Sequence, residues 1–147
     1  EKFAKDISGI IDAVICVDLP SDVVEEKQLR DSLKKENIAL IKLITPTTSD
    51  ERIKEIVKDA EGFIYSVNVE GQTGVKSANL DRVNLQIEKI KKYTTIPVVS
   101  GFGIKNEEDV KTFSKSKADG IVLGSAIVNE IQKKAVKPWI NILLPTF

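Results

Sequence analysis

Two glycine-ended apolar segments contain the residues best placed for chemistry. One runs from Val98 to Ile104 (VVSGFGI) and the other from Ala118 to Ala126 (ADGIVLGSA). In each, a short strand ends at glycine, where peptide N–H groups can approach an anion with no Cβ in the way. In (β/α)8 barrels, phosphate usually binds between the loops after the seventh and eighth strands and a short helix N-terminus. The two segments therefore predict a site for a phosphorylated small molecule.

The elements that position this site are predicted as strands alternating with helices. Apolar runs rich in β-branched residues predict parallel strands at Ala13–Val17, Ala39–Leu43, Gly62–Val67, Pro97–Ser100 and Gly120–Leu123. Amphipathic stretches predict helices at Asp22–Lys35, Ser49–Asp59, Leu80–Tyr93 and Asn106–Ser114. Each parallel crossover needs a helix of its own, so the alternation indicates successive βαβ units.

The chain of 147 residues fits one α/β domain, spanning residues 1–147. A complete (β/α)8 TIM barrel has eight strands and typically about 250 residues, so about five βα units of such a barrel are expected here. A doubly wound open sheet explains the alternation almost as well. The paired glycine turns favour the partial barrel.

The amino-acid composition of the chain limits the kinds of partner that it can be expected to bind. The chain carries 22 basic and 22 acidic residues, which gives no electrostatic reason to expect nucleic acid or a membrane surface. It has no histidine, so imidazole-based triads and metal sites are excluded, and we expect no metal. Its single cysteine, Cys16, lies in an apolar run, where we expect it to pack in the core, and favours a cytoplasmic location. No apolar run reaches the roughly 20 residues that span a bilayer.

The beginning of the chain is predicted to lie inside a helix. Glu1–Ser8 has apolar residues at helical spacing and no capping residue. We therefore expect the sequence to be part of a longer protein whose N-terminal portion is absent.

Several loop motifs occur in a specific order along the chain. Asp18-Leu19-Pro20 follows the first predicted strand, and Thr45-Pro46-Thr47-Thr48-Ser49 follows the second. Tyr65 lies in the third predicted strand, and Glu70-Gly71-Gln72-Thr73-Gly74 follows that strand. The fourth and fifth predicted strands are followed by Gly101-Phe102-Gly103-Ile104 and Gly124-Ser125-Ala126. In this order and spacing the chain resembles the tryptophan synthase α subunit family along nearly its whole length. The last two motifs alone are common among phosphate-binding barrels, whereas the Asp-Leu-Pro, Thr-Pro-Thr-Thr and Thr-Gly elements are more specific.

The resemblance implies a (β/α)8 barrel, of which strands four to eight are present here. It implies cleavage of indole-3-glycerol phosphate to indole and glyceraldehyde 3-phosphate by a cofactor-free retro-aldol reaction in tryptophan biosynthesis. By matching positions, the phosphate-binding residues are Gly74, Gly103, Gly124 and Ser125. The substrate pocket is lined by Ile15, Leu43, Tyr65, Thr73, Phe102 and Val122, with Thr73 in a loop over the site.

The resemblance also implies a partner. Indole passes to a β subunit, which carries the pyridoxal phosphate, and Asp18, Pro20 and Pro46 are expected to face that subunit. The family's catalytic glutamate and aspartate lie on strand two and the loop after it, before this chain begins. We therefore expect no catalytic residue in residues 1–147, and the fragment alone is expected to be inactive.

Two alternatives remain open at this level. One is a different phosphate-binding barrel, such as an isomerase or epimerase, whose acid/base residues would also lie on missing strands. The other is a noncatalytic interaction module that self-associates through exposed strand edges. The charged run Glu88–Lys92 lacks interleaved aromatic residues, so we expect a solvated helix face and no nucleic-acid contact.

Overall fold

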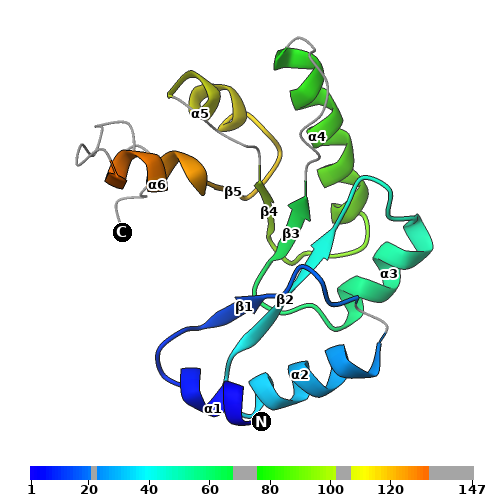
Figure 1. Cartoon of the computed structure of the whole chain (residues 1–147). Coiled ribbons are helices and arrows are strands. Elements are labelled where there is room, and N and C mark those ends of the chain that lie inside the picture. Colours follow the sequence, from blue (N-terminus) through cyan, green and yellow to red (C-terminus); the bar gives the residue numbers. More distant parts are fainter. Residues whose placement is uncertain (21–22, 68–75, 102–106, 133–147) are drawn as a thin grey trace.

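The computed structural model describes residues 1–20, 23–67, 76–101 and 107–132, and Figure 1 shows strands and helices in alternation. The strands are β1 (Ala13–Ile15), β2 (Ala39–Ile44), β3 (Ile64–Val67), β4 (Val98–Gly101) and β5 (Gly120–Val122). The helices are α1 (Lys2–Ile7), α2 (Val24–Lys34), α3 (Asp50–Lys58), α4 (Lys76–Lys91), α5 (Glu107–Phe113) and α6 (Ser125–Gln132). Within the described ranges, no helix is long and apolar enough to cross a membrane.

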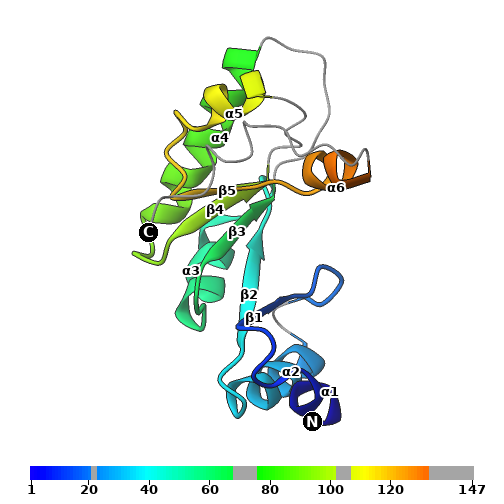
Figure 2. The same ribbon diagram turned by 90° about the vertical axis from the view of Figure 1, so that its left-hand side faces the viewer.

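The order of the strands decides between the two predicted folds. The sheet has five parallel strands in the order β1-β2-β3-β4-β5, so each strand pairs with the next one in the chain. A doubly wound sheet reverses its strand order part-way, and this sheet does not. Right-handed crossovers between successive strands put their helices on one side of the sheet. The result is a curled half-barrel, as the partial-barrel prediction requires (Figures 1 and 2).

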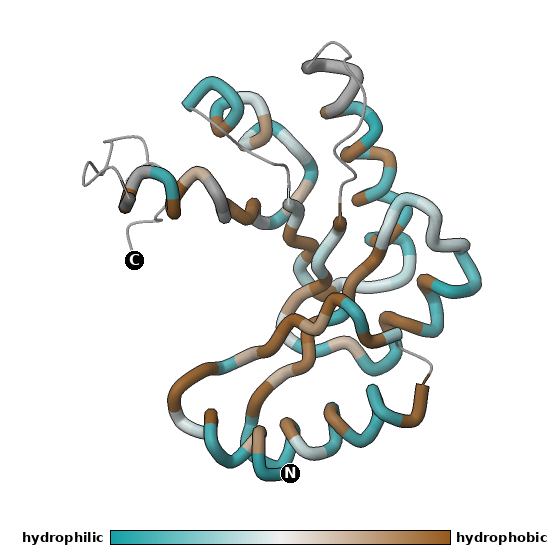
Figure 3. Tube along the Cα trace, in the orientation of Figure 1, coloured by the Kyte–Doolittle hydropathy of each residue, from teal (hydrophilic) through white to brown (hydrophobic). Residues whose placement is uncertain are grey.

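The larger core lies between the sheet and helices α3–α6. Ile44, Ile64 and Val98 point from β2, β3 and β4 into one buried cluster with Ile87 and other aliphatic side chains. Three members of the predicted apolar stripe of α4 are buried here, namely Val83, Ile87 and Ile90. Figure 3 shows the hydrophobic stretches concentrated along the strands, while the helices alternate in character. Burial of these aliphatic groups is the main force holding β2–β5 to their helices.

A smaller core lies under α1 and α2 and contains Ala4, Leu33, Ile38 and Leu40. Cys16 is half-buried and packs against it, as expected of a cysteine in an apolar run.

A buried ion pair lies on the helix-covered side of β2, near this smaller core. Lys42 of β2 forms an ion pair with Glu26 of α2, and both side chains are only 5% exposed. Arg30, one turn further along α2, is 3.9 Å from the same carboxylate and 2.5 Å from Asp59 at the end of α3. The network therefore ties α2 to both β2 and α3.

Local signals explain where two elements begin and end. Ser49 precedes α3, and its side chain accepts a hydrogen bond of 3.2 Å from the Arg52 N–H, as expected of an N-cap. Gly62 has φ +69°, and a Cβ there would lie 3.2 Å from Ile41 Cδ1, so glycine suits this turn before β3. Helix α1 has no side-chain cap, which agrees with the uncapped start predicted for it.

The charged side chains of Glu88–Lys92 are solvent-accessible, as predicted, with Glu88, Lys89 and Lys91 exposed to 45%, 32% and 36%, but several of them also bind neighbouring elements. Glu88 forms an ion pair with Lys117, and Lys91 binds Asp119 at 2.7 Å. Lys89 lies 3.0 Å from Asp50 and donates to the Thr48 carbonyl at 2.7 Å. Helical spacing placed these charges opposite the apolar stripe, but it contained no information about α3 and the Lys117–Asp119 turn.

Candidate functional site

The side chains predicted to line a substrate pocket share the face of the sheet that the helices leave open. Ile44, Ile64 and Val98 face the helices, so the alternation of a strand turns Leu43 and Tyr65 to the opposite face. Ile15 lies on this open face of β1 and Val122 on that of β5, by the same alternation. Thr73 and Phe102 lie outside the described residues. The structure thus places four predicted pocket residues on one face, across four strands.

Tyr65 lies directly over the end of the neighbouring strand. A Cβ built on Gly101 would lie 2.9 Å from the Tyr65 ring carbon Cζ, so a larger residue at position 101 would force the phenol to shift. Tyr65 pairs in register with Leu43 on one side and Val99 on the other. The phenol therefore lies over Gly101, at the carboxyl end of β4.

The Gly124 turn follows β5 and leads into α6. The Gly124 carbonyl accepts hydrogen bonds from the N–H groups of Ile127 and Val128 at 3.0 and 3.2 Å, so Gly124 stands at the cap position of the helix. The first N–H groups of a helix have no partner inside it and favour anions. A Cβ at Gly124 would meet nothing within 4 Å, and its φ is outside the left-handed region. The turn itself therefore does not require glycine.

Of the remaining residues predicted to bind phosphate, the structure describes only Ser125. Gly74 and Gly103 lie outside the described residues. Ser125 is the first residue of α6, so its backbone adjoins the Gly124 turn. Their convergence on one anion stays a prediction.

The residues predicted to face a partner are exposed. Asp18 and Pro20 lie on the loop after β1, and Pro46 lies on the loop after β2. Both loops leave the carboxyl ends of parallel strands, which lie at the same edge of a sheet. Asp18 and Pro46 are thus presented at one end of the molecule.

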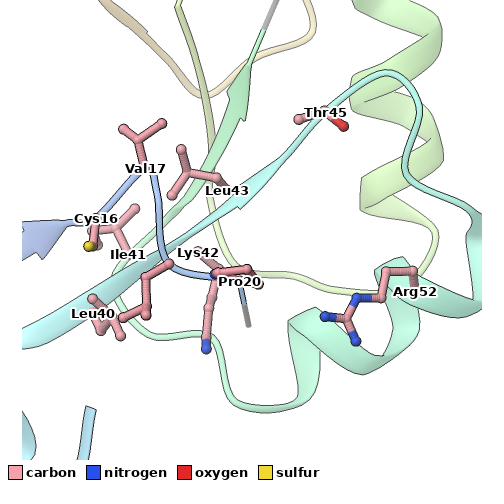
Figure 4. A pocket seen from close by; sticks show the side chains of 10 residues that line it. Cys16, Val17, Pro20, Leu40, Ile41, Lys42, Leu43, Thr45 and Arg52 are labelled. Atoms are coloured by element: carbon pink, nitrogen blue, oxygen red, sulfur yellow. The ribbon is translucent and has the colours of Figure 1, made fainter. Parts of the chain in front are cut away.

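A cavity of about 220 Å³ opens beside these loops, and Figure 4 shows its labelled side chains. Its walls come from the β1–α2 connection, from β2 and from Arg52 of α3. The lining residues are Cys16, Val17, Leu19, Pro20, Leu40, Ile41, Lys42, Leu43, Thr45 and Arg52. Leu43 and Pro20 were predicted as site residues, whereas Lys42 and Arg52 were not.

The open face suits binding better than proton transfer. On the described strands, its side chains are aliphatic except for the Tyr65 phenol. Such a face can pack against a flat apolar group and offer it one hydroxyl. A general acid/base needs a titratable group within hydrogen-bond reach of the reacting atoms. Among the described strand residues, the open face carries no carboxylate.

The sequence as a whole matches a known family. The model of the tryptophan synthase alpha chain family matches residues 1–141. The chain belongs to this family. A tryptophan synthase alpha chain from Phenylobacterium zucineum is 42% identical over 132 residues, and one from Bacillus thuringiensis is 40% identical over 124 residues. These matches cover 89% and 84% of this chain but only 47% of each relative.

Solved structures show the same fold. The tryptophan synthase alpha subunit of Campylobacter jejuni is 38% identical to this chain and superposes with a TM-score of 0.78; the match covers 52% of that subunit. The match takes in 89% of the present chain. A mutant alpha subunit from Pyrococcus furiosus is 30% identical with a TM-score of 0.72; the match covers 90% of this chain and 52% of that one. The fold is therefore that of about half of a TIM barrel, and the chain spans about half the length of the relatives it matches.

Two features of this chain were not predicted from sequence. Gly101 was quoted as part of a motif but not as the residue that makes room for Tyr65. Lys42 is buried within a strand and faces Glu26. A single lysine inside the apolar run ALIKLI was the available signal for a buried charge, because lysine is almost never fully buried unless it is paired.

Proposed function

We propose that this chain forms the indole-facing and phosphate-binding part of a tryptophan synthase α subunit. The complete subunit cleaves indole-3-glycerol phosphate to indole and glyceraldehyde 3-phosphate by a retro-aldol reaction. The observation that carries this proposal is the open face of the sheet, which carries Leu43, Tyr65 and Val122 and whose last strand leads into the Gly124 turn. Family membership supplies the reaction, and the geometry of this face supplies a place for an aromatic phosphate ester.

In this proposal the indole ring packs against the aliphatic side chains of the open face. Tyr65 closes one side of the slot because its phenol lies over Gly101. The glycerol-phosphate end extends toward the carboxyl ends of β4 and β5, where the Gly124 turn offers N–H groups at the start of α6. The exposed apolar area of the slot favours the ring, and the helix N-terminus favours the dianion.

The proton transfers of the reaction are assigned to carboxylates outside residues 1–147. Tautomerising the indole ring and accepting the hydroxyl proton require an acid/base pair, which the family carries on its second strand and the loop after it. The α reaction uses no cofactor in this scheme, and pyridoxal phosphate belongs to the β subunit. We place the protein in the cytoplasm, with the β subunit as its partner.

Phosphate binding is tested by Gly124→Val in the full-length parent protein. The branched side chain should block the approach of the anion and weaken binding of glycerol phosphate by about tenfold or more in a calorimetric titration. Because a Cβ at Gly124 meets no neighbour, the fold should be retained, which circular dichroism checks. Asn129→Val, at an exposed position of the same helix, is the matched control. Equal affinity in the wild type and Gly124→Val would remove the phosphate assignment.

The activity of the fragment gives a second test. A protein consisting of residues 1–147 should release no detectable indole, because losing a general acid/base alone costs about 10²–10⁴ in rate. The full-length parent, assayed under the same conditions, is the positive control. Indole release by the fragment at a rate near that of the parent would contradict the assignment of catalysis to the missing carboxylates.

One observation favours a second candidate function for the fragment, as a self-associating module. Strand β1 is the first strand of the sheet, and Ile15 and Val17 beside this edge are 44% and 74% exposed. An open edge with apolar neighbours readily pairs with another chain. Sedimentation of residues 1–147 should then show a concentration-dependent dimer, whereas a monomer at all concentrations would exclude this role.

A further inference from the structure

Helix α4 holds the loop between β2 and α3 from one side. Gln86 and Lys89 are spaced three residues apart on α4, so they lie on the same face of the helix, and Tyr93 follows in the turn after the helix ends at Lys91. The Gln86 amide donates to the carbonyl of Ile44, the last residue of β2, at 3.3 Å. The Lys89 ammonium donates to the Thr48 carbonyl at 2.7 Å, near the other end of the loop. Figure 1 shows the connection between β2 and α3 running beside α4.

The first residue of α3 is held by Lys89 of α4 and by Tyr93 in the turn after that helix. Asp50 accepts a hydrogen bond of 2.6 Å from the Tyr93 hydroxyl and lies 3.0 Å from the Lys89 ammonium. The Tyr93 hydroxyl and then Lys89 lower the pKa of Asp50 below its usual range, so the carboxylate stays charged in both contacts. The beginning and the end of the loop are thus both bonded to α4.

The loop is also bonded internally. The Thr45 N–H donates to the Thr48 hydroxyl at 3.1 Å, and the Thr48 N–H donates to the Thr45 carbonyl at 3.1 Å. The Thr45 hydroxyl lies 3.0 Å from that of Thr47 and 3.1 Å from that of Thr48. Thr45, Pro46 and Thr47 are nevertheless exposed. The loop therefore presents an exposed surface whose shape is fixed before anything binds to it.

We propose that Gln86 and Lys89 of α4, together with Tyr93 in the turn after it, are positioning residues that preset the Thr45–Ser49 loop for docking of the β subunit. This inference rests on the proposed function, which supplies the partner. A loop that is already ordered loses less conformational freedom on binding, so presetting raises affinity without adding a contact. The three side chains act through the loop rather than by contact with substrate.

The test compares two lysines of the same helix in the full-length parent protein. Lys89→Met removes an ion pair with Asp50 and a hydrogen bond to a carbonyl. Lys91→Met removes an equivalent set, an ion pair with Asp119 at 2.7 Å and a hydrogen bond to the Lys117 carbonyl at 3.0 Å, away from the loop. The two lysines are similarly exposed, at 32% and 36%. The pair therefore separates presetting of the loop from general loss of stability.

Two measurements are made on each variant. Hydrogen exchange of the Thr48 amide, without the partner, should be faster in Lys89→Met and unchanged in Lys91→Met. The affinity for the β subunit, measured by calorimetry, should fall about tenfold in Lys89→Met and stay unchanged in Lys91→Met. Tyr93→Phe keeps the ring and loses the hydroxyl bonded to Asp50, so it should show smaller changes in the same direction.

The outcomes distinguish this inference from the proposed function. If the wild type binds the β subunit and Lys89→Met binds it equally well, the positioning role is wrong. Equal weakening by both methionine variants would also overturn it, because the effect would then be one of general stability. If the wild type does not bind the β subunit, both the proposed partner and this inference fail.

Discussion

The two cores on the helix-covered side of the sheet differ in how their polar neighbours are satisfied. Beside the larger core, the buried polar side chains Ser66, Gln86 and Ser100 are uncharged. Gln86 donates to strand-end carbonyls at 3.3 and 3.5 Å. Beside the smaller core, the buried polar residues are charged, namely Glu26 and Lys42. Strand carbonyls satisfy the Gln86 amide, and the Ser66 hydroxyl stays buried without a partner among the described residues, whereas each buried charge depends on its opposite.

This difference separates two kinds of contribution to folding. Aliphatic packing around Ile64 and Ile87 is non-directional and contributes free energy in proportion to buried area. The Glu26–Lys42 pair offsets its own desolvation and adds little net free energy, but it fixes how α2 is placed on β2. The larger core should therefore set the stability of the sheet, and the ion pair should set the orientation of its first helix.

The largest effect is expected from breaking the ion pair on one side only. Lys42→Met leaves Glu26 buried and should lower the free energy of unfolding by about 3–5 kcal/mol. Arg30, 3.9 Å from the Glu26 carboxylate, offsets part of this and favours the lower end of the range. Urea unfolding of the full-length parent, followed by circular dichroism, measures the loss.

The double variant provides the control for this prediction. Glu26→Leu combined with Lys42→Met removes both charges and should return the free energy of unfolding to within about 1 kcal/mol of wild type. A double variant as unstable as Lys42→Met alone would contradict the prediction. It would show that the ion pair adds to the free energy of unfolding beyond offsetting the desolvation of its own two charges.

A second test asks whether the two cores unfold separately. Ile87 and Leu33 are both fully buried, and replacing either by alanine should cost about 2–5 kcal/mol. Hydrogen exchange should differ: Ile87→Ala should speed exchange in β3 and β4, and Leu33→Ala chiefly in β1 and α2. Faster exchange of β3 and β4 in Leu33→Ala would mean that the two cores form one cooperative unit.

The smallest effect concerns the outer end of the ion network. A hydrogen bond from Arg30 lowers the pKa of Asp59, so its contribution to stability is present above the usual pKa of about 3.9 and is lost as pH falls through the lowered value. Because Asp59 is 61% exposed, this contribution is small. In Asp59→Asn, stability should decline less steeply below about pH 4 than in wild type. Asp6→Asn on α1 is the control, and an unchanged slope in Asp59→Asn would contradict the prediction.

Much of the fold followed from the pattern of apolar residues. Runs such as Ala39–Leu43 predicted all five strands, and the observed bounds differ by one or two residues at their ends. The sequential strand order did not follow from that pattern, because a doubly wound sheet has the same alternation of elements. The resemblance of the loop motifs supplied the missing information, since it depends on residues at the carboxyl ends of the strands.

Site residues could be predicted from the sequence only where the alternation of strand side chains or a loop motif indicates their position. Ile15, Leu43, Tyr65 and Val122 lie on the open face because strand side chains alternate. The contact between Tyr65 and Gly101 joins residues far apart in sequence and depends on the register of β3 with β4. The contacts of Lys89 with Thr48 and Asp50 could not be predicted, because these partners lie far from Lys89 in the sequence. The roles of Gly74, Thr73, Phe102 and Gly103 stay predictions.

The sequential order of the strands has a kinetic consequence. Each strand pairs with the next in the chain, as in the register of Ala13 with Ala39, so every pairing closes a loop of modest length. Low sequence separation between contacting residues speeds folding. During synthesis each new strand can add to a sheet that already exists, because none has to wait for a distant segment. The sheet can therefore grow at the pace of translation, one βα unit at a time.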